Sequence, residues 1–385
     1  MVALSGGHLA VDFASGSVPA LIPFLTTRFH LSYALAAVLL LAATVSSSLV
    51  QPLFGLMSDR RGALWLIPGG VGLAAVGIGG AAVSPVYPLV VLLVFAGGIG
   101  VAAFHPEGAK FAALASGRRR ASGMSYFNIG GNAGYAFGAF VTGQLVVWLG
   151  LWSALLAMVP VAVVSLVLVR LLRMLSELQT DGGIGAAGSG EDRRGAMASL
   201  SAVIALRSVA WFTLLAFVPL WSVSLGRSKA AGNRLLFLML LAGALGTLLL
   251  GPIADRVGLR RTLAVTQAAV GPLVLAFVYV GGLPGTVALM LVGICVVGTF
   301  GVTMVLSQLY LPRHIGMASG LSVGLAMGVG GIAAVVLGAV ADVVDLRLAL
   351  TISAAAPALG VFFCLRLPAP AQRVAAKPQI VAPVD

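Results

Sequence analysis

Four ionisable side chains lie inside long apolar stretches of the chain: Asp12, His105, Glu107 and Arg207. A charge at the centre of a membrane span costs about 2.5–3.5 kcal/mol on insertion scales, and residues kept there are functional by default. Asp12 can act as a proton-titrating carboxylate, because burial favours the neutral form of an acid. The alternative is an acid near the membrane interface, stabilised by the helix N-terminus and by His8 one turn earlier.

His105 and Glu107 flank a proline in one of these stretches. Pro106 lacks a backbone donor and frees a carbonyl one turn earlier, so the sequence predicts a kink that exposes polar backbone. His105 titrates near neutral pH, and Glu107 can pair with Lys110 three residues on. Together with Asp12, these two residues are the candidates for proton coupling. The alternative is that a Glu107–Lys110 pair only closes the end of the helix.

Arg207 lies early in the apolar stretch 200–222. It can face a central cavity and attract an anionic group, or neutralise Asp12; the alternative is a side chain that snorkels to the membrane surface. Asn128 and Asn132 are one helical turn apart and share a face, with Tyr135 near it. We interpret all four as candidate binding residues, although an interhelical hydrogen bond fits the asparagines as well.

Composition indicates that lipid is the solvent for most of the molecule. The 385 residues are 60% hydrophobic and 9% charged, with a mean hydropathy of +1.09, whereas soluble domains carry about 25% charged residues. Only helices and closed barrels satisfy their backbone inside a membrane. The apolar runs are unbroken over about 20 residues, the length that a spanning helix needs, so we predict an all-α membrane protein.

Charged or glycine- and proline-rich breaks separate twelve candidate spans. They cover approximately 8–28, 33–57, 63–83, 86–113, 121–149, 151–173, 200–222, 233–254, 261–281, 285–310, 316–341 and 346–367. We therefore expect an N-terminal six-helix bundle (1–175), a flexible glycine-rich linker (176–199), a C-terminal six-helix bundle (200–367) and a disordered proline- and alanine-rich tail (368–385).

The arginines lie in short loops, so we interpret the net charge of +12 as a signal for membrane topology and not for a nucleic-acid partner. With both termini in the cytoplasm, 17 Lys and Arg residues fall at cytoplasmic loops and ends, and five fall outside. Arg227, Lys229 and Arg234 lie together on the outer side, against the trend. Cys295 and Cys364 both fall in apolar runs, so we expect neither a disulfide framework nor a metal site.

A charged turn occurs twice in the chain. The pattern Gly-x-x-x-Asp-Arg-x-Gly spans residues 55–62 and 251–258, with an offset of 251 − 55 = 196 residues. The triplet Ala-Ser-Gly begins at 121 and again at 318, with an offset of 318 − 121 = 197. Two nearly equal offsets indicate a duplicated unit, and two similar membrane bundles are typical of a transporter.

In these motifs the chain resembles the major facilitator superfamily, whose members carry this turn between spans 2 and 3. Within it, the chain is similar to the fosmidomycin-resistance group of bacterial exporters, on His8-Leu9-x-x-Asp12-Phe13, Phe104-His105-Pro106-Glu107-Gly108, Arg118-Arg119-Arg120 and Gly130-Gly131-Asn132-Ala133-Gly134. Two positions depart from the family. Ala63-Leu64 replaces a basic pair after the first turn, and Ala139 follows Gly138 where antiporters carry proline.

The resemblance implies twelve helices in two pseudo-symmetric bundles that rock about a central site. It also implies that the aspartates of the two turns form a cytoplasmic gate with nearby arginines and helix N-termini. The candidate gating residues are Asp59, Arg60, Asp255, Arg256 and Arg118. The stripe Gly130, Gly134 and Gly138 permits close helix packing, and we expect it to be a smooth contact on which the bundles move.

We expect a monomeric secondary transporter in a bacterial inner membrane that exchanges protons for a small anionic or amphipathic compound and confers drug or antibiotic resistance by efflux. An importer or facilitator of an organic anion is the first alternative, and a non-transporting membrane protein is the second. No nucleotide-binding loop, metal cluster or nucleophile elbow is visible, so we expect neither an enzyme nor a cofactor.

Overall fold

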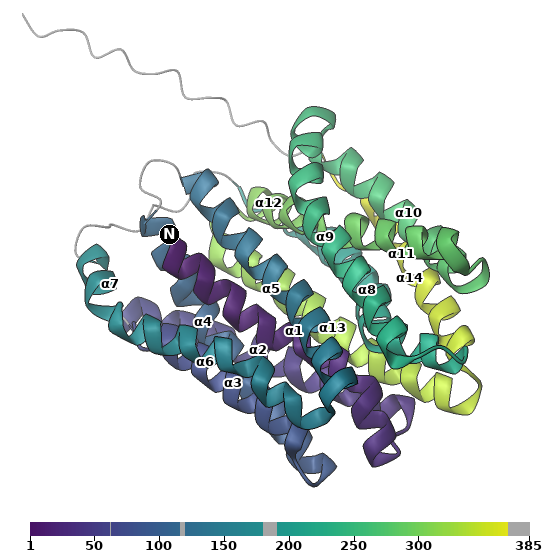
Figure 1. Cartoon of the computed structure of the whole chain (residues 1–385). Helices are drawn as coiled ribbons and strands as arrows, with labels where there is room; N and C mark the ends of the chain where they lie inside the picture. The colour runs from purple at the N-terminus through teal and green to yellow at the C-terminus, as the bar shows by residue number, and fades with distance from the viewer. Residues whose placement is uncertain (62, 116–119, 180–190, 369–385) are drawn as a thin grey trace, which may run out of the picture.

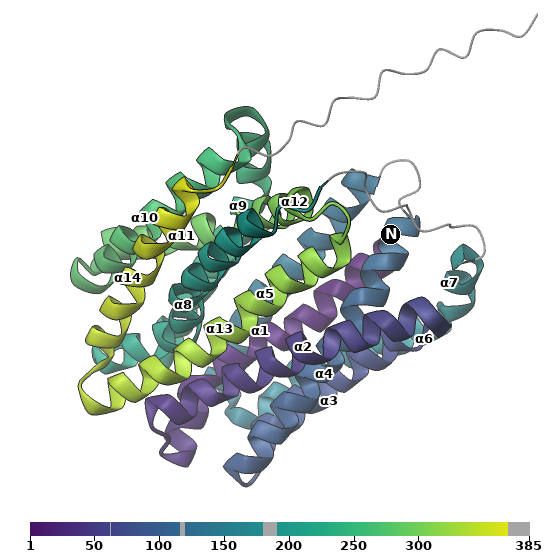
Figure 2. The same cartoon turned by 180° about the vertical axis from the view of Figure 1, so that it is seen from behind.

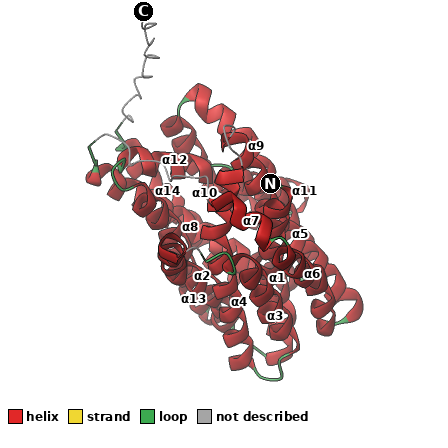
Figure 3. Cartoon of the chain, turned by 90° about the vertical axis from the view of Figure 1, so that its left-hand side faces the viewer, coloured by secondary structure: helices red, strands yellow, loops and turns green. Residues whose placement is uncertain are grey.

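The computed structural model describes residues 1–61, 63–115, 120–179 and 191–368, and the regular structure in these residues is helical (Figure 3). The N-terminal half forms α1 (Val2–Phe29), α2 (Tyr33–Arg61), α3 (Leu66–Val83), α4 (Tyr87–Ala115), α5 (Arg120–Leu149), α6 (Ala154–Arg170) and the short α7 (Leu172–Gln179). The C-terminal half forms α8 (Arg194–Ser224), α9 (Lys229–Val257), α10 (Leu259–Tyr279), α11 (Gly282–Val297), α12 (Phe300–Tyr310), α13 (Ile315–Val343) and α14 (Leu346–Leu365).

The predicted all-α membrane fold of two six-helix bundles is confirmed. Eleven helical segments in the described part of the chain are long and apolar enough to cross a membrane, with α11 and α12 forming one segment, Gly282–Tyr310. The remaining one of the twelve predicted spans, 121–149, is α5, a helix of 30 residues whose glycines and asparagines lower its mean hydropathy. Both ends of the predicted linker are helical, since α7 reaches Gln179 and α8 begins at Arg194. Residues 180–190 and the predicted tail from 369 lie outside the described residues.

The two bundles lie side by side, and they meet along two pairs of helices (Figures 1 and 2). Helix α2 packs on α13, and α5 packs on α9. Helix α1 begins and α14 ends at the same end of the molecule, which we call the terminal end. We call the opposite end, where α1 is followed by α2, the far end.

In the described part of the chain, hydrogen bonds between the bundles lie between the far end and the middle of the interface. Asn233 Nδ2 of α9 donates to the carbonyl of Ala20 at 3.1 Å, and Ser47 Oγ of α2 donates to Met327 Sδ of α13 at 3.6 Å. A phenylalanine of α9, Phe237, also packs against Phe140 of α5, with ring centroids 4.5 Å apart.

Glycines of α13 show that the contact between α2 and α13 ends about halfway along α13. A Cβ at Gly338 would lie 2.8 Å from the Cα of Ala34, and one at Gly331 would lie 2.9 Å from Leu41 Cδ1. A Cβ at Gly324 or Gly328, nearer the terminal end, would have no atom within 4 Å. The bundles therefore touch near the far end and separate toward the terminal end.

The glycine stripe of α5 packs inside the N-terminal bundle. A Cβ at Gly130, Gly134 or Gly138 would collide with the carbonyl oxygens of Ser5, Leu9 and Phe13, respectively. The stripe thus lets the backbone of α5 lie against that of α1, through positions four residues apart on both helices. The expectation that these glycines form a moving contact between the bundles is wrong, because their partner belongs to the same bundle.

Replacing Gly134 with leucine tests this close approach. The new Cβ would overlap the carbonyl of Leu9, and since both partners are helix backbone, we expect a loss of about 1–3 kcal/mol in folding stability. Thermal unfolding of the detergent-purified protein measures it. Gly324→Leu is the control, because its Cβ meets open space. Equal unfolding temperatures for the two variants would contradict the packing.

Candidate functional site

Helices α1 and α4 bring three polar side chains together inside the N-terminal bundle. His8 and Asp12 lie one turn apart on α1, with His8 Nε2 3.3 Å from Asp12 Oδ2. His105 of α4 approaches the other carboxylate oxygen, with Nε2 3.5 Å from Asp12 Oδ1. The side chains are 8%, 18% and 27% exposed for His8, Asp12 and His105. We call these three residues the His–Asp cluster.

Backbone carbonyls fix the tautomer of both histidines. His8 Nδ1 lies 2.8 Å from the carbonyl oxygen of Phe127, and His105 Nδ1 lies 2.8 Å from that of Val101. A carbonyl oxygen only accepts, so each Nδ1 carries a hydrogen and each Nε2 carries the remaining lone pair when the ring is neutral. Two lone pairs facing a carboxylate repel it. The contacts with Asp12 become favourable when a cation lies between the partners.

A proton is the simplest such cation. Protonation of either Nε2 converts an acceptor into a charged donor that faces Asp12, so the His–Asp cluster has places for up to two protons beyond those fixed on Nδ1. The donor atoms of its three residues also lie within 4.8 Å of one another and could hold a metal ion, which the sequence did not predict. Proton binding needs no change in this geometry.

Aromatic rings and a glycine enclose the His–Asp cluster. The His8 ring stacks on Phe127 at 4.1 Å between centroids and meets His105 edge-on at 5.0 Å. A Cβ at Gly131 would overlap the His8 ring and lie 2.7 Å from Asp12 Oδ2, so only glycine leaves the space that the cluster fills. These apolar walls strengthen every electrostatic interaction inside the cluster.

Glu107 lies apart from this cluster although it follows His105 by two residues. Its side chain is fully buried, and neither carboxylate oxygen has a hydrogen-bond partner among the described residues. The predicted pair with Lys110 is therefore wrong for this conformation. A carboxylate without hydrogen-bond partners is costly to bury.

Arg207 is buried in the C-terminal bundle, with 4% of its surface exposed. Its Nη1 donates to Thr299 Oγ1 at 2.6 Å, at the break between α11 and α12. Cys295 and Cys364 are its electrostatic neighbours. The prediction that Arg207 neutralises Asp12 is wrong, since the ion-pair partners of Asp12 are the two histidines. The guanidinium also does not reach the surface, as snorkelling would require.

Tyr135 lies close enough to Asp12 to interact with it electrostatically. Asn128 is exposed, and Asn132 and Tyr135 are half-buried on the adjoining part of α5. The three side chains are spaced to share the side of the helix that borders the His–Asp cluster. Their assignment as binding residues stays a prediction.

The candidate gating residues of α2 and α9 lie where these helices end, at the terminal end of the molecule. The described contacts do not join them. Asp255 and Arg256 are exposed at the end of α9, and neither joins an ion pair in the described ranges. The backbone at Asp59 and Arg60 ends α2, while their side chains lie outside the described residues, as does Arg118. The gate stays a prediction.

Two residues of these sites were not among the predicted site residues. His8 could have been recognised from its spacing, since a residue four before Asp12 shares its helix face. Thr299 gives a weaker signal, because threonine is common in membrane helices. It follows Gly298, at which the tenth span breaks into α11 and α12.

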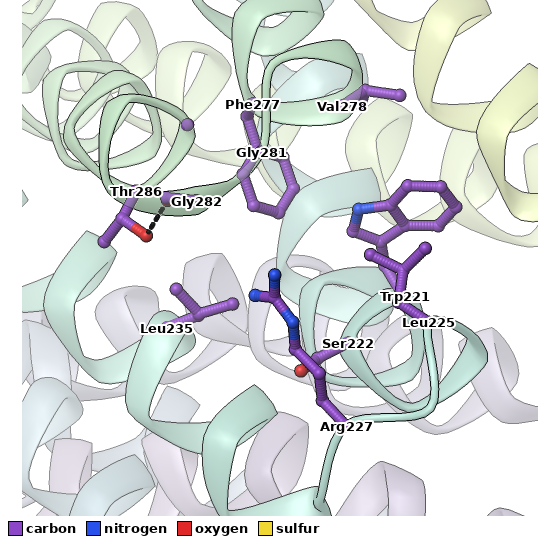
Figure 4. Close-up of a pocket in the computed structure, with 11 residues that line it drawn as sticks. Trp221, Ser222, Leu225, Arg227, Leu235, Phe277, Val278, Gly281, Gly282 and Thr286 are labelled. Atoms are coloured by element: carbon purple, nitrogen blue, oxygen red, sulfur yellow. Dashed lines mark hydrogen bonds between the residues drawn. The ribbon is translucent and has the colours of Figure 1, made fainter.

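A pocket near the far end of the C-terminal bundle lies away from all these candidates. Figure 4 shows the Arg227 side chain pointing into it, between Trp221 and the turn that follows Phe277. The hydroxyl of Thr286 donates to the carbonyl of Gly282 at its rim, at 2.8 Å. Because most of its walls are apolar and no predicted residue lines it, this pocket is not a candidate site.

Sequence comparisons identify relatives over nearly the whole chain. The profile of the Major Facilitator Superfamily matches residues 4–335. The uncharacterized MFS-type transporter YfnC of Bacillus subtilis is 30% identical over 375 residues, 92% of this chain and 89% of that protein. The fosmidomycin resistance protein of Escherichia coli is 29% identical over 370 residues, 93% of this chain and 90% of that protein.

Solved structures share the fold at low sequence identity. A bacterial homologue of the human lysosomal transporter Spinster, in an inward-facing and occupied conformation, superimposes with a TM-score of 0.79 at 14% identity, covering 95% of both chains. The nucleoside transporter NupG gives a TM-score of 0.76 at 13% identity, covering 95% of this chain and 99% of that one.

Asp12→Asn tests the His–Asp cluster as a proton site. The amide keeps the size of the carboxylate but removes the charge that favours protonated imidazoles, so we expect the variant to bind fewer protons on acidification. Potentiometric titration of the purified protein between pH 8 and pH 5 measures them. Asp345→Asn, at the far end, should bind at most one proton fewer. An Asp12→Asn titration equal to that of the wild type would contradict the proposed cluster chemistry.

Proposed function

The chain belongs to the Major Facilitator Superfamily, and from this premise we propose that it is a proton-coupled exporter of small anionic or amphipathic compounds. The observation that carries this proposal is the His–Asp cluster. Its two Nε2 atoms face one carboxylate, in an arrangement that is favourable only with a bound cation. A group that must bind a cation in one state and release it in another is what coupling requires.

Alternating access supplies the two states. The bundles touch at the far end and part toward the terminal end, so the described conformation opens toward the termini. The excess of Lys and Arg at the loops of the terminal end supports a cytoplasmic position for that end. The described state is then the one in which the His–Asp cluster exchanges protons and cargo with the cytoplasm of a bacterium, across its inner membrane.

The coupling cycle follows from the positions of the acids. Protons that reach Asp12, His8 and His105 from outside travel inward as the bundles rock, and the cargo takes the opposite route. One elementary charge that crosses the membrane yields about 2.3 kcal/mol per 100 mV. Glu107, buried without a hydrogen-bond partner among the described residues, offers a second place for a proton on α4, two residues after His105.

The buried Arg207 supports an anionic cargo. Its described hydrogen bond goes to a neutral hydroxyl, and no described carboxylate forms an ion pair with it. A buried cation without a counter-charge is unstable, so an anion that enters near Thr299 would be bound strongly. The half-buried Asn132 and Tyr135 of α5 add neutral donors for the rest of the cargo. The relative named for fosmidomycin resistance supports drug efflux as the outcome.

Import of an organic anion is the second candidate function. It is favoured by one observation, the Gly138-Ala139 pair at the position where antiporters of the superfamily carry Gly-Pro. An importer would carry protons and anion in the same direction. The two candidates therefore differ in the sign of the coupling between the proton gradient and the cargo gradient.

Transport into inside-out vesicles distinguishes the two functions. With an acidic lumen, an exporter should accumulate a labelled anionic drug and release lumenal protons, whereas an importer should show no proton-driven accumulation. We expect His105→Gln to reduce gradient-driven accumulation at least about tenfold, because the ring that shares a proton with Asp12 is gone. Exchange of cargo without a gradient should persist. Normal accumulation by His105→Gln would refute its part in coupling.

Arg207 separates charge from hydrogen bonding in cargo recognition. Arg207→Lys keeps the charge, so we expect an apparent affinity for anionic cargo within about tenfold of the wild type. Arg207→Ala should lower the apparent affinity by more than about tenfold, since it removes a buried cation that binds the cargo. Competition by unlabelled anions in the same vesicles measures both values. Wild-type affinity in the two variants would remove Arg207 from the binding site.

A further inference from the structure

A carboxylate of the C-terminal bundle caps a helix of the N-terminal bundle. Asp342, the penultimate residue of α13, accepts two backbone hydrogen bonds from the start of α2. Its Oδ1 lies 2.6 Å from Tyr33 N and its Oδ2 lies 3.0 Å from Ala34 N. The first N–H groups of a helix have no partner within the helix, and a negative charge beside them also complements the helix dipole.

Two other helices at the far end are capped from within their own bundle, and α2 also has such a cap, since Ser32 Oγ accepts from Leu35 N at 3.2 Å. Helix α9 is capped by Ser228 Oγ, which accepts from Ala231 N at 3.2 Å. Helix α14 is capped by Asp345, whose Oδ1 accepts from Leu348 N at 2.7 Å. Among the described residues, Asp342 is the acid whose capping bonds cross from one bundle to the other.

Tight packing surrounds this cap on the side toward the membrane interior. Gly338, one turn before Asp342, lies against the backbone of Tyr33 and Ala34. The contact between α2 and α13 continues through Gly331 to Met327, and nearer the start of α13 a Cβ at Gly324 would meet open space. Asp342 thus lies at the closed extreme of the interface between the bundles.

We propose that Asp342 is a gating residue that holds the far end closed in the described conformation. Access to the His–Asp cluster from the far end requires α2 and α13 to part there. That movement must withdraw the carboxylate from the N–H groups of Tyr33 and Ala34 and leave those two groups to water, while the bond from Leu35 N to Ser32 Oγ remains. The cap therefore stabilises the state that is open toward the termini relative to the state that is open at the far end.

This inference rests on the proposed alternating access between two states. Loss of a typical helix N-cap changes an equilibrium about fivefold. We expect Asp342→Ala to raise the ratio of the far-end-open state to the described state by about that factor. Asp342→Asn keeps one oxygen acceptor and loses the charge, so its ratio should lie between those of the wild type and Asp342→Ala. If the alanine variant fails to fold, the asparagine variant carries the test.

Double electron–electron resonance in lipid nanodiscs measures this ratio. Spin labels at Val86→Cys, in the loop before α4, and Leu283→Cys, in the first turn of α11, report on exposed far-end positions of the two bundles, in a Cys295→Ala and Cys364→Ala background. The matched control is Asp345→Ala, which removes a cap of the same chemistry within one bundle and should leave the ratio unchanged. Thermal unfolding of each variant reports the structural cost separately.

The outcomes distinguish the gate at Asp342 from the alternating access on which it depends. A raised ratio in Asp342→Ala with an unchanged ratio in Asp345→Ala supports the gate. Two populated distances in the wild type, with the same ratio in Asp342→Ala, overturn the gate but leave alternating access intact. Equal shifts in both variants also overturn it, because the cap then acts only on local stability. A single wild-type distance that no pH or cargo changes overturns both proposals.

Discussion

A charge inside a membrane must have a partner, and this constraint explains where the protein keeps its few charges. Asp12 is held by two imidazoles from two helices. Arg207 is held by a threonine at a helix break, and Glu107 has no hydrogen-bond partner among the described residues. These three solutions differ in how much they depend on a mobile ion or ligand. In the proposed function the paired acid binds a proton, and the buried base, with which no described carboxylate pairs, binds an anion.

The close approach of α5 to α1 makes the first of these solutions possible. Because the glycines of α5 bring the two backbones into contact, the carbonyl of Phe127 reaches His8 Nδ1. That hydrogen bond turns the other ring nitrogen toward Asp12. The small-residue packing that stabilises the bundle therefore also sets the protonation chemistry of the site. Gly131 joins the two effects, since it belongs to the packed helix and lines the His–Asp cluster.

Hydropathy predicted the spans within a few residues, because an apolar run in lipid has no stable alternative to a helix. Spacing along one helix placed His8 beside Asp12, but contacts between helices did not follow from the sequence. Nothing in the sequence sets the rotation of α4 that turns His105 toward Asp12. The stripe from Gly130 to Gly138 likewise predicted a close contact without naming its partner. Helix partners depend on the complete packing of the bundle, which a single sequence does not display.

The antiparallel pairing of α2 and α13 has a consequence for reversibility. Helix α2 begins where α13 ends, and the end of α2 that carries Asp59 lies toward the end where α13 begins. Each helix thus carries an aspartate in its final turns and begins with N–H groups that have no partner within the helix. The same kind of capping contact can form at either end of this helix pair. The hydrogen bonds lost when one end opens can therefore be replaced by those that form when the other end closes. A carrier whose two states are balanced in this way has little preference of its own, and the gradients across the membrane set the direction in which it runs.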